Sequence, residues 1–183
     1  MEAIESSGVE NLSLRQLARE LGVSHAAPGK HFRDKQALVD ALALAGFQAM
    51  NARIAEAAHG SASHRSRFVR VARAYVEFAV SHPVLLSAMY STKHHPDSSE
   101  SLRSIGEEGM HVARALIIAA QDDAELGPGD ADSMALVCFA SLHGAALLAA
   151  GDLLDGASVE DLVAATTDLL WAGMVAGMPA RQG

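Results

Sequence analysis

One stretch, residues 12–42, constrains the fold of this chain more than any other segment. Leu14, Leu17 and Leu21 recur at helical spacing, so they line one face of a short helix. Gly22 ends that helix, because a residue without a Cβ atom can take the left-handed conformation of a sharp reversal. The stretch therefore begins with a helix and a tight turn.

The residues after this glycine predict a second and a third helix. Ser24 can accept from the unpaired N–H groups of the next turn, so a short second helix is expected over His25–His31. Asp34 can cap a third helix in the same way, and Leu38 and Leu42 give that helix a buried face. This order is typical of a helix-turn-helix motif, which holds its second helix out for insertion into a DNA major groove.

Composition favours an all-α fold for the whole chain. Hydrophobic residues make up 50 % of the 183 residues, and most are alanine and leucine with few aromatic residues among them, which favours close-packed helices over a sheet. We expect a helix-turn-helix head at residues 1–45 and a C-terminal helical bundle at residues 46–183. Cys138 is the only cysteine, so it is expected to be a small core residue without a disulfide partner.

The net charge of −8 at pH 7 argues against a nonspecific binder of polyanions. Residues 1–47 hold five basic residues and six carboxylates, a net charge of −1, whereas the rest of the chain holds nine basic and sixteen acidic residues, a net charge of −7. All five basic residues of the head fall between residues 15 and 35. The head is thus the less acidic part, and a local positive face can form there.

Periodicity and turn residues divide the chain beyond the head into further helices. Loops are expected at residues 59–63, 92–99, 126–129 and 151–156, where glycine, proline and short polar residues gather. The expected helices cover residues 34–58, 65–81, 100–122, 130–150 and 158–178, with a short apolar segment at residues 84–90. Helical spacing places six apolar residues of the helix at 65–81 on one face, which is expected to face the core: Phe68, Val71, Ala72, Tyr75, Phe78 and Ala79.

The last two expected helices are the most apolar part of the chain. Residues 131–150 hold one charged residue and residues 162–178 hold one. Two helices that are apolar over so much of their surface need more cover than one small subunit supplies. We therefore predict a homodimer through them.

We expect no membrane span, on the interpretation that the apolar runs fall short of the roughly 18 uncharged residues that a span needs. The opening residues, MEAIESSGVE, lack the basic region of a signal peptide. A cytoplasmic protein without a membrane partner is therefore expected.

The DNA-binding head of the tetracycline-repressor (TetR) family resembles residues 8–24, GVENLSLRQLARELGVS, followed by residues 30–38, KHFRDKQAL. Over about thirty residues, the glycine, the capping serine, the aromatic residue and the lysine stand at the positions that they have in the family's motif. The C-terminal domain of the family's Trp-His-Gly subgroup is similar to three further segments, with Ser141 in place of the tryptophan. These segments are residues 74–79 with His82-Pro83, Met89-Tyr90, and Leu142-His143-Gly144.

The resemblance implies a homodimeric all-α regulator, usually a repressor, that a small apolar or aromatic ligand releases from a palindromic double-stranded DNA operator. It assigns base contacts to the start of the recognition helix and phosphate contacts to the residues around it, since short side chains suit base readout while cations and N–H groups suit phosphates. The base-facing residues are Ser24, His25 and Ala26, and the backbone-facing ones are Ser13, Arg15, Lys30, His31 and Lys35.

Candidate ligand-lining residues are the aromatic, methionine and histidine side chains of the C-terminal body, which are equally well explained as core. They are Phe78, Met89, Tyr90, Met110, His111, Phe139, His143 and Trp171. His143 is also explained by a hydrogen-bonded core or interface position. Neither a cofactor nor a metal is expected, because His94, His95 and His111 lack carboxylate or cysteine partners at ligand spacing.

Two departures from the family pattern keep an alternative function open. Gly29, preceded by Pro28, stands where the family usually has a tyrosine between the recognition helix and the His-Phe pair. The segment before Gly8 is about ten residues shorter than the family's first helix. The alternative is an all-α dimeric ligand- or partner-binding protein whose head no longer binds DNA.

Enzyme chemistry is not expected, because the sequence has neither a glycine-rich phosphate loop nor a serine in a nucleophile motif. For the arginines at positions 65, 67, 70 and 73, solvated surface is favoured over a second nucleic-acid face.

Overall fold

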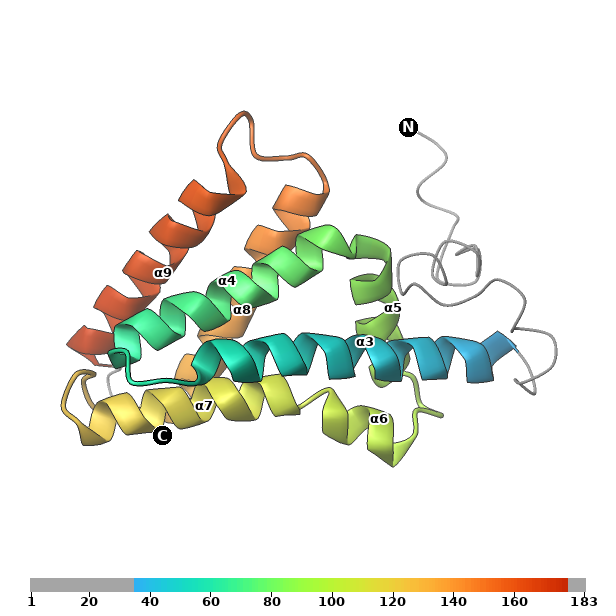
Figure 1. The fold of residues 1–183 in the computed structure, drawn as a ribbon, viewed down its shortest axis with the longest axis horizontal. Coiled ribbons are helices and arrows are strands. Elements are labelled where there is room, and N and C mark those ends of the chain that lie inside the picture. The colour runs from blue at the N-terminus through green and yellow to red at the C-terminus, as the bar shows by residue number, and fades with distance from the viewer. Residues whose placement is uncertain (1–34, 178–183) are drawn as a thin grey trace, which may run out of the picture. The chain divides into compact units, whose positions relative to one another are not determined.

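The computed structural model describes residues 35–177, which form seven α-helices without a strand in that range, and the predicted all-α fold is confirmed there (Figure 1). The predicted helices before residue 35 lie outside the described residues. The helices are α3 (Lys35–Ala58), α4 (His64–Ser81), α5 (Pro83–Lys93), α6 (Glu100–Ile105), α7 (Glu108–Asp122), α8 (Ala131–Ala150) and α9 (Val159–Ala176).

The described residues fall into two compact units. The first unit joins the part of α3 up to Ala49 with residues 82–107, which hold α5 and α6. The second unit joins residues 50–81 with the chain from Glu108 onward, so it holds the end of α3 together with α4, α7, α8 and α9. Helix α3 therefore contributes to both units.

Side chains of α3 and α5 meet within the first unit. A Cβ atom added to Gly46 would lie 2.6 Å from the sulfur of Met89, so the glycine lets the two helices approach. Beside it, the buried ring of Phe47 meets the ring of Tyr90 edge-on, with 5.6 Å between centroids. Helix α5 continues to Lys93, and Thr92 is buried rather than part of the predicted polar turn.

The single helix predicted over residues 100–122 was wrong, because the chain forms two helices with a break at Gly106 and Glu107. Lys93 Nζ donates to the carbonyl oxygen of Gly106 at 3.0 Å. A Cβ atom at Gly106 would lie 2.6 Å from the Lys93 side chain, so the lysine occupies the space beside the glycine. A tertiary hydrogen bond at a residue of low helix propensity accounts for the break.

Helix α4 is packed against three helices of the second unit: α7, α8 and α9 (Figure 1). The predicted apolar face of α4 is confirmed, because all six of its residues are buried. They are Phe68, Val71, Ala72, Tyr75, Phe78 and Ala79.

Local signals set the helix ends, since Asp130 and Ser158 accept from backbone N–H groups at the starts of α8 and α9.

Cys138 is a core residue, as predicted. Its thiol is buried and lies 3.8 Å from the sulfur of Met174 on α9. Burial raises the pKa of this thiol from 9.0 to about 11, so the reactive thiolate form is suppressed.

Candidate functional site

The predicted DNA contacts fall at the edge of the described chain or outside it. Lys35 is the first residue of α3. The other seven lie outside the described residues, and they are Ser13, Arg15, Ser24, His25, Ala26, Lys30 and His31. Their roles stay predictions.

An aromatic cluster joins α4 to α8 and contains two of the predicted ligand-lining residues. The hydroxyl of Tyr75 and Nδ1 of His143 share a hydrogen bond of 2.6 Å. The ring of Phe139 stacks on His143 at 5.3 Å between centroids and meets Tyr75 edge-on at 6.0 Å. This α4–α8 aromatic cluster combines apolar ring faces with a polar pair, which suits an aromatic ligand.

Tyr75 belongs to this cluster, and the sequence analysis placed it only in the core. Its periodicity within α4 predicts burial, which is correct, but periodicity does not reveal a partner on α8, 68 residues later in the chain. The hydrogen bond also agrees with the interpretation of His143 as a hydrogen-bonded core or interface residue.

Burial lowers the pKa of His143 below its ordinary value of 6.5, because a charged imidazolium loses hydration there. The folded protein thus binds fewer protons at this ring than the unfolded chain does. The resulting stability is fully present above pH 6.5 and declines as the pH falls below it.

We expect His143→Gln to flatten the acid side of the stability profile. Glutamine keeps a polar side chain but does not titrate, so the free energy of unfolding should fall less steeply between about pH 7 and pH 5. The difference in slope is bounded by one proton, about 1.4 kcal/mol per pH unit. Urea unfolding at a series of pH values measures it, and parallel profiles for both proteins would contradict the assignment.

The remaining predicted lining residues are spread over both units. Phe78 and Met89 are fully buried in different units. Met110 and Trp171 are half-buried against the core of the second unit, whereas His111 is exposed. Tyr90 packs on Phe47 in the first unit. Of the predicted set, the rings that the structure brings into direct contact are those of Phe139 and His143.

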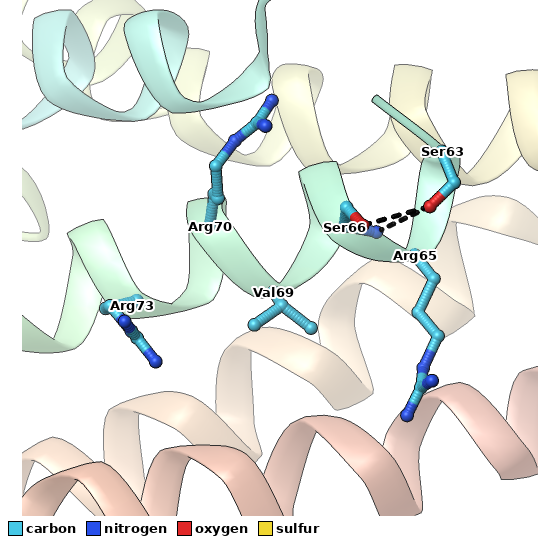
Figure 2. Close-up of a pocket in the computed structure, with 6 residues that line it drawn as sticks. All are labelled: Ser63, Arg65, Ser66, Val69, Arg70 and Arg73. Atoms are coloured by element: carbon cyan, nitrogen blue, oxygen red, sulfur yellow. Dashed lines mark hydrogen bonds between the residues drawn. The ribbon is translucent and has the colours of Figure 1, made fainter. Parts of the chain in front are cut away.

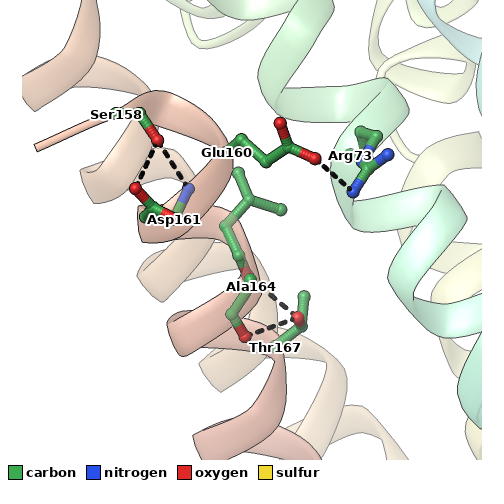
Figure 3. Close-up of polar contacts among 7 residues, drawn as sticks. Arg73, Ser158, Glu160, Asp161, Ala164 and Thr167 are labelled. Atoms are coloured by element: carbon green, nitrogen blue, oxygen red, sulfur yellow. Dashed lines mark hydrogen bonds and ion pairs between the residues drawn. The ribbon is translucent and has the colours of Figure 1, made fainter.

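The four arginines of α4 have partners within the chain. Arg65 pairs with Asp168 on α9 at 2.7 Å. Arg73 pairs with Glu160 on the same helix at 3.5 Å (Figure 3). Arg70 donates to the carbonyl oxygens of Ala57, in the last turn of α3, and of His59, just after that helix. These contacts join α4 to its neighbours, and they do not favour a second nucleic-acid surface.

The fourth arginine, Arg67, takes part in a polar chain in which the His64 ring is buried and the Asp123 carboxylate is exposed. Its guanidinium lies 2.6 Å from Nδ1 of His64, and Nε2 of the same ring lies 2.7 Å from the Asp123 carboxylate. A guanidinium only donates, so Nδ1 accepts and Nε2–H donates to Asp123. The chain links the start of α4 to the residue that follows α7. Among the residues described, no group of three or more histidine, cysteine or acidic side chains could hold a metal ion.

A hollow of about 400 Å³ lies along α4 in the second unit (Figure 2). Val69 lies between Arg65 and Arg73, whose side chains both point toward α9, while Arg70 points the other way. Ser63 and Ser66 complete the lining, and their hydroxyl groups lie 3.0 Å apart. The sequence analysis did not predict this hollow.

An apolar face covers the outside of α8 and α9. Every large apolar side chain that is exposed in the described residues lies on these two helices or on their connection. They are Leu136, Val137, Leu147, Leu148, Leu153, Leu169 and Val175. Gly144 and Gly173 lie in the same two helices, and a Cβ atom at either would meet nothing within 4 Å. We refer to this surface as the α8–α9 face.

The expectation that the apolar runs are too short to span a membrane was wrong for α8. Helix α8 is long and apolar enough by length and composition to cross a membrane, although a core helix meets the same criterion. Its contacts with α4, α7 and α9 provide protein cover for one side of it.

Comparison with known proteins identifies the family. The model of the bacterial regulatory proteins of the tetR family matches residues 1–42, and that of the tetracyclin repressor-like C-terminal domain matches residues 68–172. The chain belongs to the TetR family. It is a DNA-binding transcriptional regulator with a helix-turn-helix head, as the resemblance implied.

Solved structures share the fold of this TetR protein. A protein of unknown function from Rhodococcus sp. RHA1 is 48 % identical, with a TM-score of 0.79 over 93 % of this chain and 89 % of that one. The TetR family transcriptional regulator PfmR from Thermus thermophilus is 18 % identical, with a TM-score of 0.71 over 90 % of each chain. A regulatory protein in the tetR family from Rhodococcus RHA1 is 18 % identical, with a TM-score of 0.71 over 91 % of this chain and 88 % of that one.

The comparison with curated proteins gave no match. The resemblance to the Trp-His-Gly subgroup is not confirmed and stays a prediction. TetR regulators as a family bind operator DNA and small effectors, act as dimers, and are generally not enzymes.

Proposed function

We propose that this TetR protein is a homodimeric repressor that leaves a palindromic operator when a small apolar or aromatic effector binds its C-terminal body. The observation that carries the proposal is the α8–α9 face, because a second copy of the chain would cover it. Two recognition helices would then lie about one turn of DNA apart, roughly 34–36 Å, and read two half-sites. Such a protein acts where the DNA is, in the cytoplasm, and without a membrane partner.

Three features of the α8–α9 face support a second copy as its cover. Leu169 is 76 % exposed, an unfavourable position for leucine in water. Gly144 and Gly173 each lower helix stability by about 1 kcal/mol relative to alanine. Neither is needed for packing within the chain, since a Cβ atom would fit at both. Glycine at these two positions would allow a helix of the second copy to approach closely.

For DNA binding we propose the residues that the family resemblance assigns. Ser24, His25 and Ala26 would face base edges, while Ser13, Arg15, Lys30, His31 and Lys35 would contact phosphates. The matches at residues 1–42 and 68–172 are compatible with the proposed boundary between residues 45 and 46.

For the effector we propose contact with the α4–α8 aromatic cluster. An aromatic ligand could stack on Phe139 and exchange hydrogen bonds with the Tyr75–His143 pair. Because α8 also belongs to the α8–α9 face, a ligand that moved α8 against α4 would change the spacing of the two heads. The effector releases the DNA if it binds the dimer with the altered head spacing about 1–3 kcal/mol more tightly than the dimer with the DNA-binding spacing. The other six predicted lining residues stay predictions.

Gel-shift titration with the DNA that flanks the gene, at several salt concentrations, tests the proposal. Sequence-specific binding that weakens steeply with salt is expected. Absence of binding even at low salt would favour the alternative of a head that no longer binds DNA.

We expect Lys35→Ala to weaken DNA binding to about the same extent for every DNA sequence. The ammonium group is proposed to contact a phosphate, so its loss should also reduce the slope of log K against log salt by about 1. Arg114→Ala is the matched control, because it removes an equal charge from an exposed ion pair with Asp132 in the second unit. Equal losses for both variants would contradict a contact at Lys35.

A further inference from the structure

The hollow along α4 has a charged group at each end and an apolar middle. Arg65 and Arg73 are eight residues apart in one helix, so their Cα atoms are separated by about 12 Å. Val69 lies halfway between them and is half-buried (Figure 2). Arg65, Val69 and Arg73 are spaced four residues apart, so their side chains follow one another along one face of α4.

Each of these arginines has only part of its hydrogen-bonding capacity in use. A guanidinium group has five N–H donors. Arg65 reaches Asp168 through one nitrogen and Arg73 reaches Glu160 through one nitrogen, the latter at the long distance of 3.5 Å. The side chains of the two arginines are 56 % and 49 % exposed. Both arginines can therefore donate hydrogen bonds to a second anionic group that arrives from solvent.

We propose that this hollow binds an elongated small molecule with a carboxylate at each end and an apolar chain between them, such as a medium-chain dicarboxylate. One carboxylate would lie on Arg65, the other on Arg73, and the chain would cover Val69. Arginine suits this role, because its planar fork of donors matches a carboxylate. The site is separate from the α4–α8 aromatic cluster, and the proposal does not depend on DNA binding.

The surroundings favour this class over nucleic acid or free phosphate. Asp168 and Glu160 lie beside the two arginines, so a chain with a negative charge on every phosphate would meet more repulsion than a ligand with one carboxylate at each end. A single phosphate is too small to bridge arginines that are two helical turns apart. Arg70 turns away to the carbonyl oxygens of Ala57 and His59, so it does not add a third cation at the middle of the hollow.

Trp171 provides a direct readout of binding in the full chain. It is the only tryptophan, and its ring on α9 lies 5.7 Å from that of Phe68, the neighbour of Val69 on α4. Ligand contacts with Arg65 and Arg73 compete with the ion pairs to α9, so tryptophan fluorescence should change on binding. We expect nonanedioate to give a saturable change with a Kd of about 1 mM or tighter, weakened by salt.

Variants at both ends of the hollow test the bridging geometry. Arg65→Gln and Arg73→Gln should each weaken nonanedioate binding about tenfold, because each removes a charge-assisted contact. Arg114→Gln, which removes the cation of the exposed pair with Asp132, should leave binding unchanged. Circular dichroism of each variant checks that the fold is retained.

Glu160→Gln separates a binding role of Arg73 from a purely structural one. If Glu160 competes for Arg73, its loss should tighten binding about two- to fivefold, whereas loss of a structural ion pair would not. Asp132→Asn changes the net charge equally and should have no effect.

Three results would overturn the proposal. The first is a response to nonanedioate that does not saturate. The second is equal binding of nonanoate, which has one carboxylate, or of inorganic phosphate, since neither can bridge the two arginines. The third is equal losses for the glutamine variants of Arg65, Arg73 and Arg114, which would indicate nonspecific charge effects.

Discussion

Replacing Gly127 with alanine is expected to lower the free energy of unfolding by about 3 kcal/mol. A Cβ atom at this residue would lie 2.7 Å from the carbonyl oxygen of Val175 and 2.7 Å from the backbone nitrogen of Gly177. Both atoms belong to the backbone at the end of α9, so no side chain can rotate to relieve the overlap. Urea unfolding followed by circular dichroism, at a fixed protein concentration, measures the loss.

The loop that holds Gly127 is fixed on several sides, which prevents it from moving away. Its N–H donates to the carbonyl oxygen of Met174 at 3.0 Å, and the amide of Gln121 donates to the carbonyl oxygens of Gly127 and Gly129. The same substitution would therefore also loosen the joint between the α7–α8 loop and α9.

Gly109→Ala is the matched control for this prediction. A Cβ atom at Gly109, in the first turn of α7, would lie 3.5 Å from its nearest neighbours, an ordinary van der Waals distance. Alanine there should leave the stability unchanged or raise it, by up to about 1 kcal/mol. A Gly127→Ala variant as stable as Gly109→Ala would show that the loop adapts and that the close approach is not needed.

Leu169→Glu is expected to convert the proposed dimer into a monomer and to weaken operator binding at least a hundredfold. A carboxylate at the most exposed leucine of α9 would have to lose its hydration in the covered interface. A monomer holds one head instead of two, and linking two binding modules typically raises affinity by about 10²–10⁴. Analytical ultracentrifugation and gel-shift titration measure the two effects.

Gly173→Leu tests the same interface by shape instead of charge. The side chain has room within the chain, since a Cβ atom there meets nothing within 4 Å, and leucine favours a helix more than glycine does. The monomer should keep its fold while a closely approaching partner helix is blocked. Ala115→Glu, on the exposed side of α7, adds a carboxylate elsewhere and should leave the dimer intact. A Leu169→Glu protein that remains a dimer would place the interface on another surface.

Local signals in the sequence predicted most of the described helices, because these signals act within a few residues. The breaks at residues 59–63, 126–129 and 151–156 each contain glycine, and Asp130 and Ser158 cap the starts of the helices that follow them. Helical spacing alone predicted which residues of α4 are buried. The family followed from a dense local motif.

Long-range contacts decided what local signals could not predict. The break at Gly106 depends on a hydrogen bond from Lys93, and the α4–α8 aromatic cluster depends on Tyr75 meeting His143 from a distant part of the chain. The hollow along α4 depends on two carboxylates of α9 that orient Arg65 and Arg73.

By itself, therefore, the sequence determined the helical fold, the helix-turn-helix family and an excess of apolar surface on the last two helices. Only the tertiary structure decided which side of α8 and α9 remains exposed, and which polar side chains meet. The physical reason is that spacing along a helix places residues on a face, whereas the packing of other helices determines whether that face is covered.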